Sequence, residues 1–434
     1  MNILLILFYI LSFVVVTVGA FTLTYFPLAL IAELHPRRTP VFQSPSPLVT
    51  IIVPAYNEEK VIAHCIESIL ASDYRNFEII LVDDGSKDMT LQVMRRYEGS
   101  RRVKVVSKPN GGKAAALNAG YRLSKGEILF FVDADGIFLR NTIREMLFGF
   151  TSEKVGAVCG NDSPVNLDRL LTKLFVLQNH VGTGLVRRAL SELNCLPIVS
   201  GNIGAFRRSA LEQTDPAGAE PFYKSLGHIW EKRQSGPFRQ GFIGEDLELT
   251  WRIHRAGYQV KFSPKSIVLA EVPSTIKDLW KQRIRWARGL LKTIGLHRDM
   301  FFRTKYGPLG LYLPINFINM VIVPILQLLV LFLILVFVLA GYSPISLNIV
   351  SLILWMGLGG ALLTAFFAIG LDQAWKDLKY FYVLPLWVPY SIMMDLVTVW
   401  AIILELSGAE AQWNKLNRTG VVTRKATTVG QKKG

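Results

Sequence analysis

Cysteine is scarce in this chain of 434 residues, which contains only Cys65, Cys159 and Cys195. The three are isolated and show none of the spacings of metal-binding motifs, so a metal centre built on cysteine is excluded and buried free thiols are expected. A nucleic-acid-binding motif is also lacking. The net charge of +15 therefore gives no sufficient reason to expect a DNA or RNA partner.

Acidic residues are in the minority, with 33 Asp and Glu against 48 Lys and Arg, and much of the basic excess lies next to apolar segments. Positive charge in such places suits anionic lipid headgroups or a polyanionic substrate. We therefore expect membrane lipids as a partner and no nucleic acid. The basic residues concerned are Arg283, Arg285, Arg288, Lys292, His297, Arg298, Arg303 and Lys305, and, in the tail, Arg418, Arg424, Lys425, Lys432 and Lys433.

Apolar residues make up 51% of the chain and are concentrated in four long runs rather than spread evenly. Each run exceeds the ~20 residues that a helix needs to cross a bilayer. This pattern predicts a membrane protein that carries one soluble domain. The runs cover residues 2–32, 309–340, 347–371 and 383–406.

The apolar runs divide the chain into four parts. We expect a transmembrane helix at 1–33, a soluble domain at 34–305 that ends in membrane-interface helices, a region of about three spans at 306–406, and a basic tail at 407–434. The stretch 216–240, rich in Gly, Pro and charge, is expected to be a loop, either a gating loop or a plain surface insertion.

The first apolar run is expected to be retained rather than cleaved, because it is too long for a signal peptide and no basic residue precedes it. His35-Pro36-Arg37-Arg38 follows it, and basic flanks favour the cytoplasmic side of a membrane. We therefore expect a multi-pass protein of the cell membrane with its soluble domain in the cytoplasm.

The basic tail conflicts with a simple count of spans. Three spans after a cytoplasmic domain would place the tail outside, whereas its charge favours the inside. One segment is therefore expected to be re-entrant or to lie in the interface. The run at 309–340 is a candidate, because Pro314 and Pro324 interrupt its first part.

Strand and helix patterns alternate through the first half of the soluble domain. Apolar runs typical of buried strands are each followed by residues with helical spacing, which predicts an α/β fold with a doubly wound, mostly parallel sheet inserted between transmembrane helices. In such sheets ligands bind beyond the carboxyl ends of the strands. The expected strands are 49–54, 77–82, 103–106 and 128–132, and the expected helices are 61–70, 89–97 and 113–123.

Acidic groups follow three of these strands, at Glu58, at Asp83 and Asp84, and at Asp133 and Asp135. Side chains alternate along a strand, so Asp133 and Asp135 can project to the same side. Two carboxylates beside a glycine can cradle a hard divalent cation, which would neutralise a nucleotide diphosphate. The alternative is a solvated exit from a strand into a turn.

Three further groups allow both a functional and a structural interpretation. Lys113 follows two glycines and can meet a phosphate or a carboxylate, or remain solvated. Glu245 and Asp246 open a predicted helix, where acids can balance the helix dipole or serve as a general base. Trp280 to Trp286 suggests an amphipathic helix at the membrane, in which Arg285 can hold a diphosphate and Trp286 can stack on a sugar.

Taken together, these residues resemble the family-2 processive glycosyltransferases, the group of the bacterial cellulose, chitin, hyaluronan and poly-N-acetylglucosamine synthases. Five motifs match in order over about 240 residues. Residues 200–211 are most similar to the poly-N-acetylglucosamine synthases. The motifs are Pro54 to Glu58, the Asp-Asp-Gly of Asp83 to Gly85, the Asp-x-Asp of Asp133 and Asp135, the pair Glu245 and Asp246, and the Gln-x-x-Arg-Trp of Gln282, Arg285 and Trp286.

The resemblance implies a GT-A-type fold and a role for each residue. The donor nucleotide and its diphosphate would be bound by Ala55, Tyr56, Glu58, Asp83, Asp84, Lys113, Asp133 and Arg285. Asp135, with Asp133, would ligate Mg²⁺ or Mn²⁺. Asp246, next to Glu245, would be the general base. Gln282, Trp286, Gly201 and Asn202 would meet the acceptor.

The expected activity is polymerisation of a β-linked polysaccharide from a UDP-sugar, with UDP-N-acetylglucosamine or UDP-glucose as donor, inversion at the anomeric carbon and translocation of the product. The growing glycan would be the acceptor, and an accessory membrane or export subunit is a possible partner. Two alternatives stay open: a non-processive transferase that makes a glycolipid, as ceramide glucosyltransferases do, and a transporter or scaffold with an inactive domain.

Overall fold

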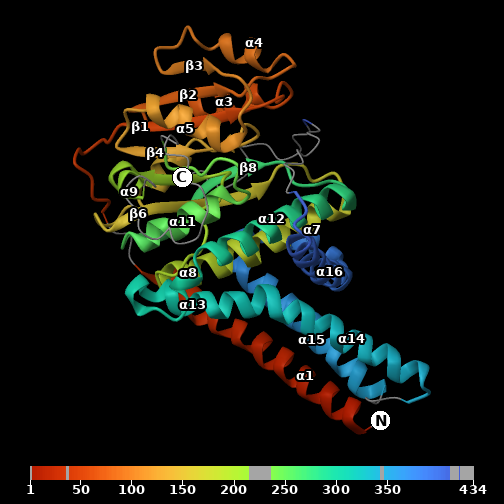
Figure 1. The fold of residues 1–434 in the computed structure, drawn as a ribbon. Coiled ribbons are helices and arrows are strands. Elements are labelled where there is room, and N and C mark those ends of the chain that lie inside the picture. Colours follow the sequence, from red (N-terminus) through yellow and green to blue (C-terminus); the bar gives the residue numbers. More distant parts are fainter. Residues whose placement is uncertain (1, 36–38, 215–235, 343–346, 411–419, 421–434) are drawn as a thin grey trace.

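The computed structural model describes residues 2–35, 39–214, 236–342, 347–410 and 420. A domain built on one sheet lies at one end, and long helices extend away from it (Figure 1). Most of the expected loop at 216–240 and most of the basic tail at 407–434 lie outside the described residues.

Within the described residues, eight strands form one sheet in the order β3-β2-β1-β4-β7-β6-β8-β5. Strand β1 pairs in parallel with β2 and β4, β2 with β3, and β6 with β8. Strand β7 is antiparallel to β4 and β6, and β5 is antiparallel to β8. The prediction of a mostly parallel α/β sheet is thus confirmed. The strands are β1 (Val49–Ala55), β2 (Phe77–Asp83), β3 (Val103–Ser107), β4 (Ile128–Phe131), β5 (Ile137–Phe138), β6 (Val155–Pro164), β7 (Gly204–Arg207) and β8 (Gln259–Ala270).

The central strands are apolar on both faces because both faces are covered. Ile51 of β1 belongs to one buried cluster and its neighbour Ile52 to another, as the two-residue period of a strand requires. Their partners across the β1–β2 ladder are Ile79 and Ile80. Burial of each such side chain contributes roughly 1.5–3 kcal/mol.

The helices of the domain lie close to their predicted positions. Helix α5 has the expected bounds, and α4 is shorter than the predicted 89–97. Helix α11 begins at Glu245, and α12 contains the predicted amphipathic segment. The helices are α3 (Ile62–Leu70), α4 (Thr90–Arg95), α5 (Lys113–Leu123), α6 (Thr142–Leu147), α7 (Leu170–Asn179), the π-helix η2 (His180–Val186), α8 (Arg187–Glu192), α9 (Arg208–Gln213), α11 (Glu245–Arg255) and α12 (Ile276–Leu296).

Apolar helices flank the domain in sequence. Among the described residues, three helical stretches are long and apolar enough to cross a membrane: Ile3–Leu34, Thr304–Leu339 and Trp375–Leu406. Helix α15 adds 25 residues. The elements are α1 (Asn2–Phe21), η1 (Thr22–Thr24), α2 (Tyr25–Leu34), η4 (Arg298–Met300), η5 (Thr304–Tyr306), α13 (Gly307–Phe317), the π-helix η6 (Ile318–Ile322), α14 (Val323–Leu339), α15 (Leu347–Leu371), η7 (Trp375–Leu386) and α16 (Trp387–Leu406).

Helix α16 differs from the other long apolar helices in its position. Helices α1, α14 and α15 extend away from the domain, whereas α16 stays beside α7 and α12 (Figure 1). Near its start, the Tyr390 ring lies 6.4 Å from the Phe175 ring of α7, and near its end Glu405 accepts a hydrogen bond of 3.0 Å from Arg288 of α12. Both ends of α16 therefore contact the domain, although its length and apolar composition also make it a candidate membrane span, and the interface segment expected in the run at 309–340 stays a prediction.

Candidate active site

The turns after β1 and β2 are hydrogen-bonded to each other. The Ala55 carbonyl accepts a bond of 2.8 Å from the Asp84 backbone N–H. Asn57 has a left-handed φ of 53°, its backbone N–H donates to Ser86 Oγ at 3.0 Å, and its side-chain oxygen accepts from the Lys87 backbone N–H at 2.7 Å. The structure thus brings the predicted nucleotide loop next to the Asp-Asp-Gly motif.

Asp84 holds the glycine turn that begins α5. Its Oδ1 accepts from Lys108 Nζ at 2.6 Å and from the Gly111 N–H at 3.0 Å, and its Oδ2 accepts from the Gly112 N–H at 2.8 Å. Gly85 next to it has a φ of 74°, and a Cβ there would lie 2.8 Å from the Asn110 nitrogen. Asp84 therefore positions the start of α5, where Lys113 is the first residue, and its predicted contact with the donor nucleotide stays a prediction. Sequence reasoning missed Lys108.

Three of the strand-end acids surround one buried thiol. Cys65 Sγ lies 3.9 Å from the Asp133 carbonyl oxygen. Burial raises the pKa of Cys65, and the charges of Asp135, Asp133 and Glu58 raise it further. Asp135 is itself buried, and its Oδ2 accepts from the Glu271 backbone N–H at 3.1 Å. Residues from the ends of β1 and β4 thus meet at one place, as the parallel sheet predicts.

Lys113 links this place to the start of α11. Its Nζ lies 2.5 Å from Asp133 Oδ1 and 3.5 Å from Glu245 Oε1. Burial lowers the pKa of Lys113, but the charges of Asp133, Glu245 and Asp246 outweigh burial and raise it. The ammonium group therefore remains charged among three carboxylates, and the alternative of a solvated lysine is excluded.

Asp246 is oriented by two main-chain donors. Helix α11 begins after Gly244, whose φ is 88°, and the N–H of Leu247 donates to Asp246 Oδ1 at 2.8 Å. The N–H of Gly201 donates to Oδ2 at 3.2 Å. A Cβ at Gly201 would lie 2.9 Å from Lys113 Nζ and 3.3 Å from Asp246 Oδ2, so a larger residue there would displace the lysine ammonium group.

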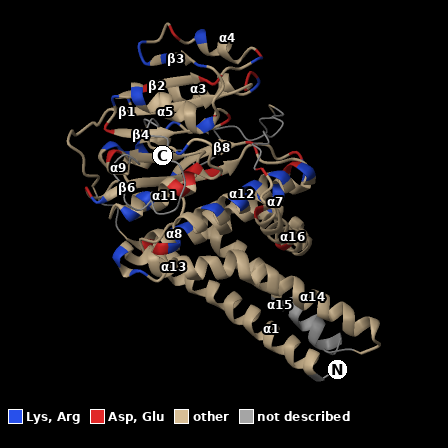
Figure 2. Cartoon of the chain, in the orientation of Figure 1, with Lys and Arg blue, Asp and Glu red and all other residues tan. Residues whose placement is uncertain are grey.

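Glu245 is buried between charges of both signs. Burial raises the pKa of its carboxyl group; the Lys113 charge opposes this rise, Asp246 adds to it, and Arg285 of α12 also opposes it. The predicted Arg285 therefore faces the start of α11. Figure 2 shows acidic positions on α11 and basic positions along α12, and the two helices contact each other.

The structure shows few contacts for the remaining predicted acceptor residues, on α12 and at Asn202. The guanidinium of Arg283 lies 4.4 Å from the centre of the Trp286 ring and 5.5 Å from that of Phe175. The amide oxygen of Gln282 is buried and accepts no hydrogen bond from a residue that the structure describes. Asn202 donates its backbone N–H to Ser200 Oγ at 3.4 Å. Contacts of these residues with an acceptor stay predictions.

Lys113 shares one small pocket with Gly201 and with the predicted base Asp246, whereas the other predicted donor residues do not line it. Charged side chains and apolar ones both line it, which brings residues from β4, α5, β7 and the start of α11 around one volume. Its lining residues are Lys113, Leu117, Phe131, Val199, Ser200, Gly201, Phe206, Phe238, Glu245 and Asp246.

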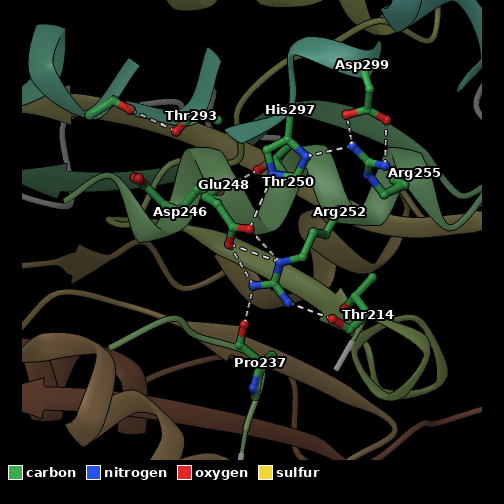
Figure 3. Close-up of polar contacts among 11 residues, drawn as sticks. Thr214, Pro237, Asp246, Glu248, Thr250, Arg252, Arg255, Thr293, His297 and Asp299 are labelled. Carbon is green, nitrogen blue, oxygen red and sulfur yellow. Dashed lines mark hydrogen bonds and ion pairs between the residues drawn. The ribbon is translucent and has the colours of Figure 1, made fainter. Parts of the chain in front are cut away.

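A second group of buried charges supports α11 from behind (Figure 3). Glu248 accepts from Arg252 Nε and Nη2 at 2.8–3.0 Å, and His297 Nε2 lies 3.3 Å from Glu248 Oε1. Burial raises the pKa of Glu248, but Arg252 and His297 outweigh burial and lower it to about 2. Arg252 also donates to the carbonyls of Thr214 and Pro237, so it ties two distant stretches to α11.

Among the described residues, no group of three or more His, Cys, Asp or Glu side chains is arranged to hold a metal ion. The predicted pair, Asp133 and Asp135, provides two carboxylates. Such a pair fits Mg²⁺ or Mn²⁺ only together with other oxygen ligands, and sites that are completed by substrate phosphates and water are of this kind.

Residues 50–214 match the family model described as glycosyl transferase family 2. The chain is 30% identical over 267 residues to a poly-beta-1,6-N-acetyl-D-glucosamine synthase of Staphylococcus epidermidis, and 29% identical over 265 residues to one of Staphylococcus aureus strain COL. These matches cover 61% and 60% of this chain and 59% of each relative.

A solved structure extends the likeness beyond the matched domain. A mannosyltransferase from Pyrobaculum calidifontis, in complex with GDP-Man and Mn²⁺, superposes with a TM-score of 0.63 at 23% identity, over 94% of this chain and 100% of that one. It shows a common fold, and the predicted GT-A-type architecture is confirmed. The sheet, the strand-end acids and the matched sequence agree: residues 50–214 match glycosyl transferase family 2 on a GT-A-type fold, and long apolar helices flank the domain in sequence.

Proposed function

We propose that this chain is a membrane-embedded inverting glycosyltransferase that extends a β-linked glycan from a UDP-sugar. The observation that best supports this proposal is the position of Lys113. Its ammonium group contacts Asp133 on the proposed donor side and Glu245 beside the predicted base. The names of the curated relatives favour UDP-N-acetylglucosamine over UDP-glucose as donor and a polysaccharide over a glycolipid as product.

The donor would lie over the carboxyl ends of β1, β2 and β4. Ala55, Tyr56, Glu58, Asp83 and Asp84 would hold the nucleoside. Lys113 and Arg285 would face the diphosphate, where a fixed cation stabilises the charge that develops as UDP leaves.

Asp133 and Asp135 would hold Mg²⁺ or Mn²⁺ together with oxygens of the diphosphate. When bound, the cation would neutralise the leaving group. The mannosyltransferase that shares the fold was solved with Mn²⁺. Lys113 would then keep the Asp133 carboxylate in a fixed orientation.

Asp246 would act as the general base. Its carboxylate would take the proton of an acceptor hydroxyl as that oxygen bonds to the anomeric carbon and the bond from this carbon to UDP breaks. The donors Gly201 and Leu247 hold the carboxylate in one orientation. Gln282, Trp286 and Asn202 would contact the acceptor from the α12 side.

The proposed location is the cell membrane, with the catalytic domain in the cytoplasm, where UDP-sugars are available. Lipids would surround α1, α14 and α15. Translocation of the glycan, with or without an export subunit, is part of the proposal.

A donor screen tests this function. The full chain, purified in lipid nanodiscs, is incubated with UDP-N-acetylglucosamine, UDP-glucose or GDP-mannose, with Mg²⁺, Mn²⁺ or EDTA. We expect metal-dependent UDP release and a product ladder that a linkage-specific hydrolase digests. A single glycolipid band would instead support the glycolipid alternative, and no UDP release with any UDP-sugar would overturn the proposal.

A further inference from the structure

Two charged side chains outside every motif lie next to the predicted base. Arg187, the first residue of α8, donates from Nη1 to Asp162 Oδ1 at 2.8 Å, and Asp162 lies near the end of β6. The Ser200 hydroxyl donates to Asp162 Oδ2 at 3.3 Å. Ser200 immediately precedes Gly201, whose N–H holds Asp246.

Asp246 is linked through the Ser200-Gly201 segment to the Asp162–Arg187 pair, since Ser200 donates to Asp162 and Gly201 donates to Asp246. Its charge contributes to raising the pKa of Lys113 and the pKa of Arg187, in both cases against the effect of burial. Lys113 contacts Asp133 of the proposed donor site, whereas Arg187 and Asp162 contact none of the proposed donor residues in the described part of the chain. An acceptor that presents its hydroxyl to Asp246 would therefore lie against Arg187 and Asp162.

Arg187 has hydrogen-bonding capacity to spare. A guanidinium carries five N–H donors, and in the described part of the chain only Nη1 of Arg187 donates, to Asp162, the Gly160 carbonyl and Cys159 Sγ. The side chains of Arg187 and Asp162 are 17% and 25% exposed, so both can be reached by a ligand. A carboxylate that accepts beside a guanidinium that donates suits neighbouring hydroxyls of a sugar. An anionic ligand is disfavoured, because Asp162 and Asp246 offset the charge of Arg187.

One carboxylate at the end of the membrane helix α15 holds the segment that carries Arg187. Asp372 Oδ2 lies 2.5 Å from His180 Nδ1, at the start of the π-helix η2, and Oδ1 accepts from Arg188 Nη1 at 2.6 Å. A Cβ at Gly184 would lie 2.6 Å from Asp372 Oδ2, so the carboxylate packs closely against the middle of η2. Turns of π-helix are rare in proteins, and those that occur are often found at functional sites.

We propose that Asp162, Arg187 and Ser200 bind hydroxyls of the terminal sugar of the acceptor beside Asp246, and that Asp372 is the positioning residue that fixes Arg187. This inference rests on the proposed function and adds an acceptor subsite to it. Arg188, which also donates to Glu33 of α2 at 3.1 Å, anchors the same segment to a second membrane helix.

The subsite is tested with Arg187→Ala and Asp162→Asn, with Arg144→Ala as the matched control. Arg144 pairs only with Asp73 among the described residues and is half exposed. The probe is a tetramer of β-linked N-acetylglucosamine, titrated calorimetrically with UDP present and used as acceptor in the transfer assay. We expect the Kd and KM for the tetramer to rise ~10- to 100-fold in both variants, as loss of charged hydrogen bonds implies, with the UDP affinity within about twofold of wild type.

Wild-type binding of UDP separates the two proposals. If UDP itself does not bind, the proposed function fails. If UDP binds but the tetramer does not, or if both variants keep the wild-type Kd for the tetramer, the subsite is wrong. Binding of a polyprenyl phosphate that requires Arg187, without binding of the tetramer, would also overturn it.

The positioning role is tested with Asp372→Asn against Glu405→Gln, since Glu405 also pairs with an arginine between a membrane helix and the domain. We expect Asp372→Asn to raise the KM for the tetramer ~3- to 10-fold with the KM for the donor unchanged, and Glu405→Gln to leave both unchanged. Gly184→Ala displaces the same carboxylate and should reproduce the effect if Asp372→Asn does not fold. Equal losses for donor and acceptor would show a merely structural role.

Discussion

The proposed donor side and the proposed acceptor side of the site are built by different kinds of contact. On the donor side, Asp84 after β2 bonds to main-chain N–H groups 27 and 28 residues away, in the turn after β3 of the next βα unit. On the acceptor side, Arg188 reaches Asp372 and His180 reaches the same carboxylate across 184 and 192 residues. The proposed donor side is thus fixed by local turns, whereas the proposed acceptor side depends on contacts between the domain and the apolar helix α15.

The largest expected effect is a loss of transfer rate when the predicted base is replaced, with UDP binding retained. Asp246→Asn keeps the shape of the side chain but removes its ability to take a proton, so the rate of transfer should fall ~10²- to 10⁴-fold. UDP affinity should stay close to wild type, because the donor side is built without Asp246. Initial rates and UDP titration measure both, with Asp168→Asn on the surface as control. Full activity of Asp246→Asn would show that another group is the base.

A second variant tests how much the buried charges of Glu248 and Arg252 in α11 stabilise the fold. Glu248→Gln leaves Arg252 without its anionic partner in a site where Glu248 is 0% exposed, and breaking such a pair costs roughly 3–5 kcal/mol. Thermal unfolding in detergent should show the loss. The double variant Glu248→Gln/Arg252→Met should be less destabilised than the sum of the single variants. Additive effects would contradict coupling between the two residues.

Lys113 belongs to both sides, and its removal should damage both. Lys113→Met leaves the carboxylates of Asp133, Glu245 and Asp246 without their shared cation, so kcat/KM should fall ~10²- to 10³-fold. UDP binding should weaken as well. Lys108→Met makes the comparison sharper: Lys108 contacts Asp84 on the donor side, so UDP affinity should fall while the acceptor KM stays unchanged.

The smallest expected effect is a loss of stability in acid. His254 is buried, its Nε2–H donates to the Leu196 carbonyl at 2.9 Å, and burial lowers its pKa to about 4. The unfolded chain takes up this proton near the ordinary pKa of 6.5, so the contribution is complete above pH 6.5 and is lost as the pH falls towards 4. The loss is at most on the order of 3 kcal/mol. Unfolding of His254→Gln across this range should be less dependent on pH than that of wild type.

Sequence patterns predicted most of the donor side because its residues follow strands. Apolar runs located β1, β2 and β4, and the acids that follow them lie at one edge of the sheet because the carboxyl ends of parallel strands share that edge. The bounds of α5 followed from the two glycines and the helical spacing after them. The structure decided the open alternatives for Lys113, which bonds to carboxylates rather than to water alone.

The acceptor side could not be predicted from the same kind of pattern. Asp162 and Arg187 belong to no periodic run and are brought together only by the pairing of β6 and the packing of α8. Strand β7 lies antiparallel between β4 and β6, and its apolar composition does not predict this direction. Helix α16 has the composition of a span, and nothing in that composition predicts its contacts with Phe175 and Arg288 of the domain.

Because Asp372 holds η2 in place, the thickness of the bilayer would affect binding of the acceptor. Helix α15 has 25 residues and is roughly 38 Å long, more than the ~30 Å hydrocarbon thickness of a typical membrane. Such a helix tilts to fit, and the angle changes with lipid chain length. Since Asp372 directly follows α15, shorter or longer acyl chains would shift the carboxylate and, through it, Arg187. Affinity for the glycan would then vary with lipid composition while affinity for UDP would not.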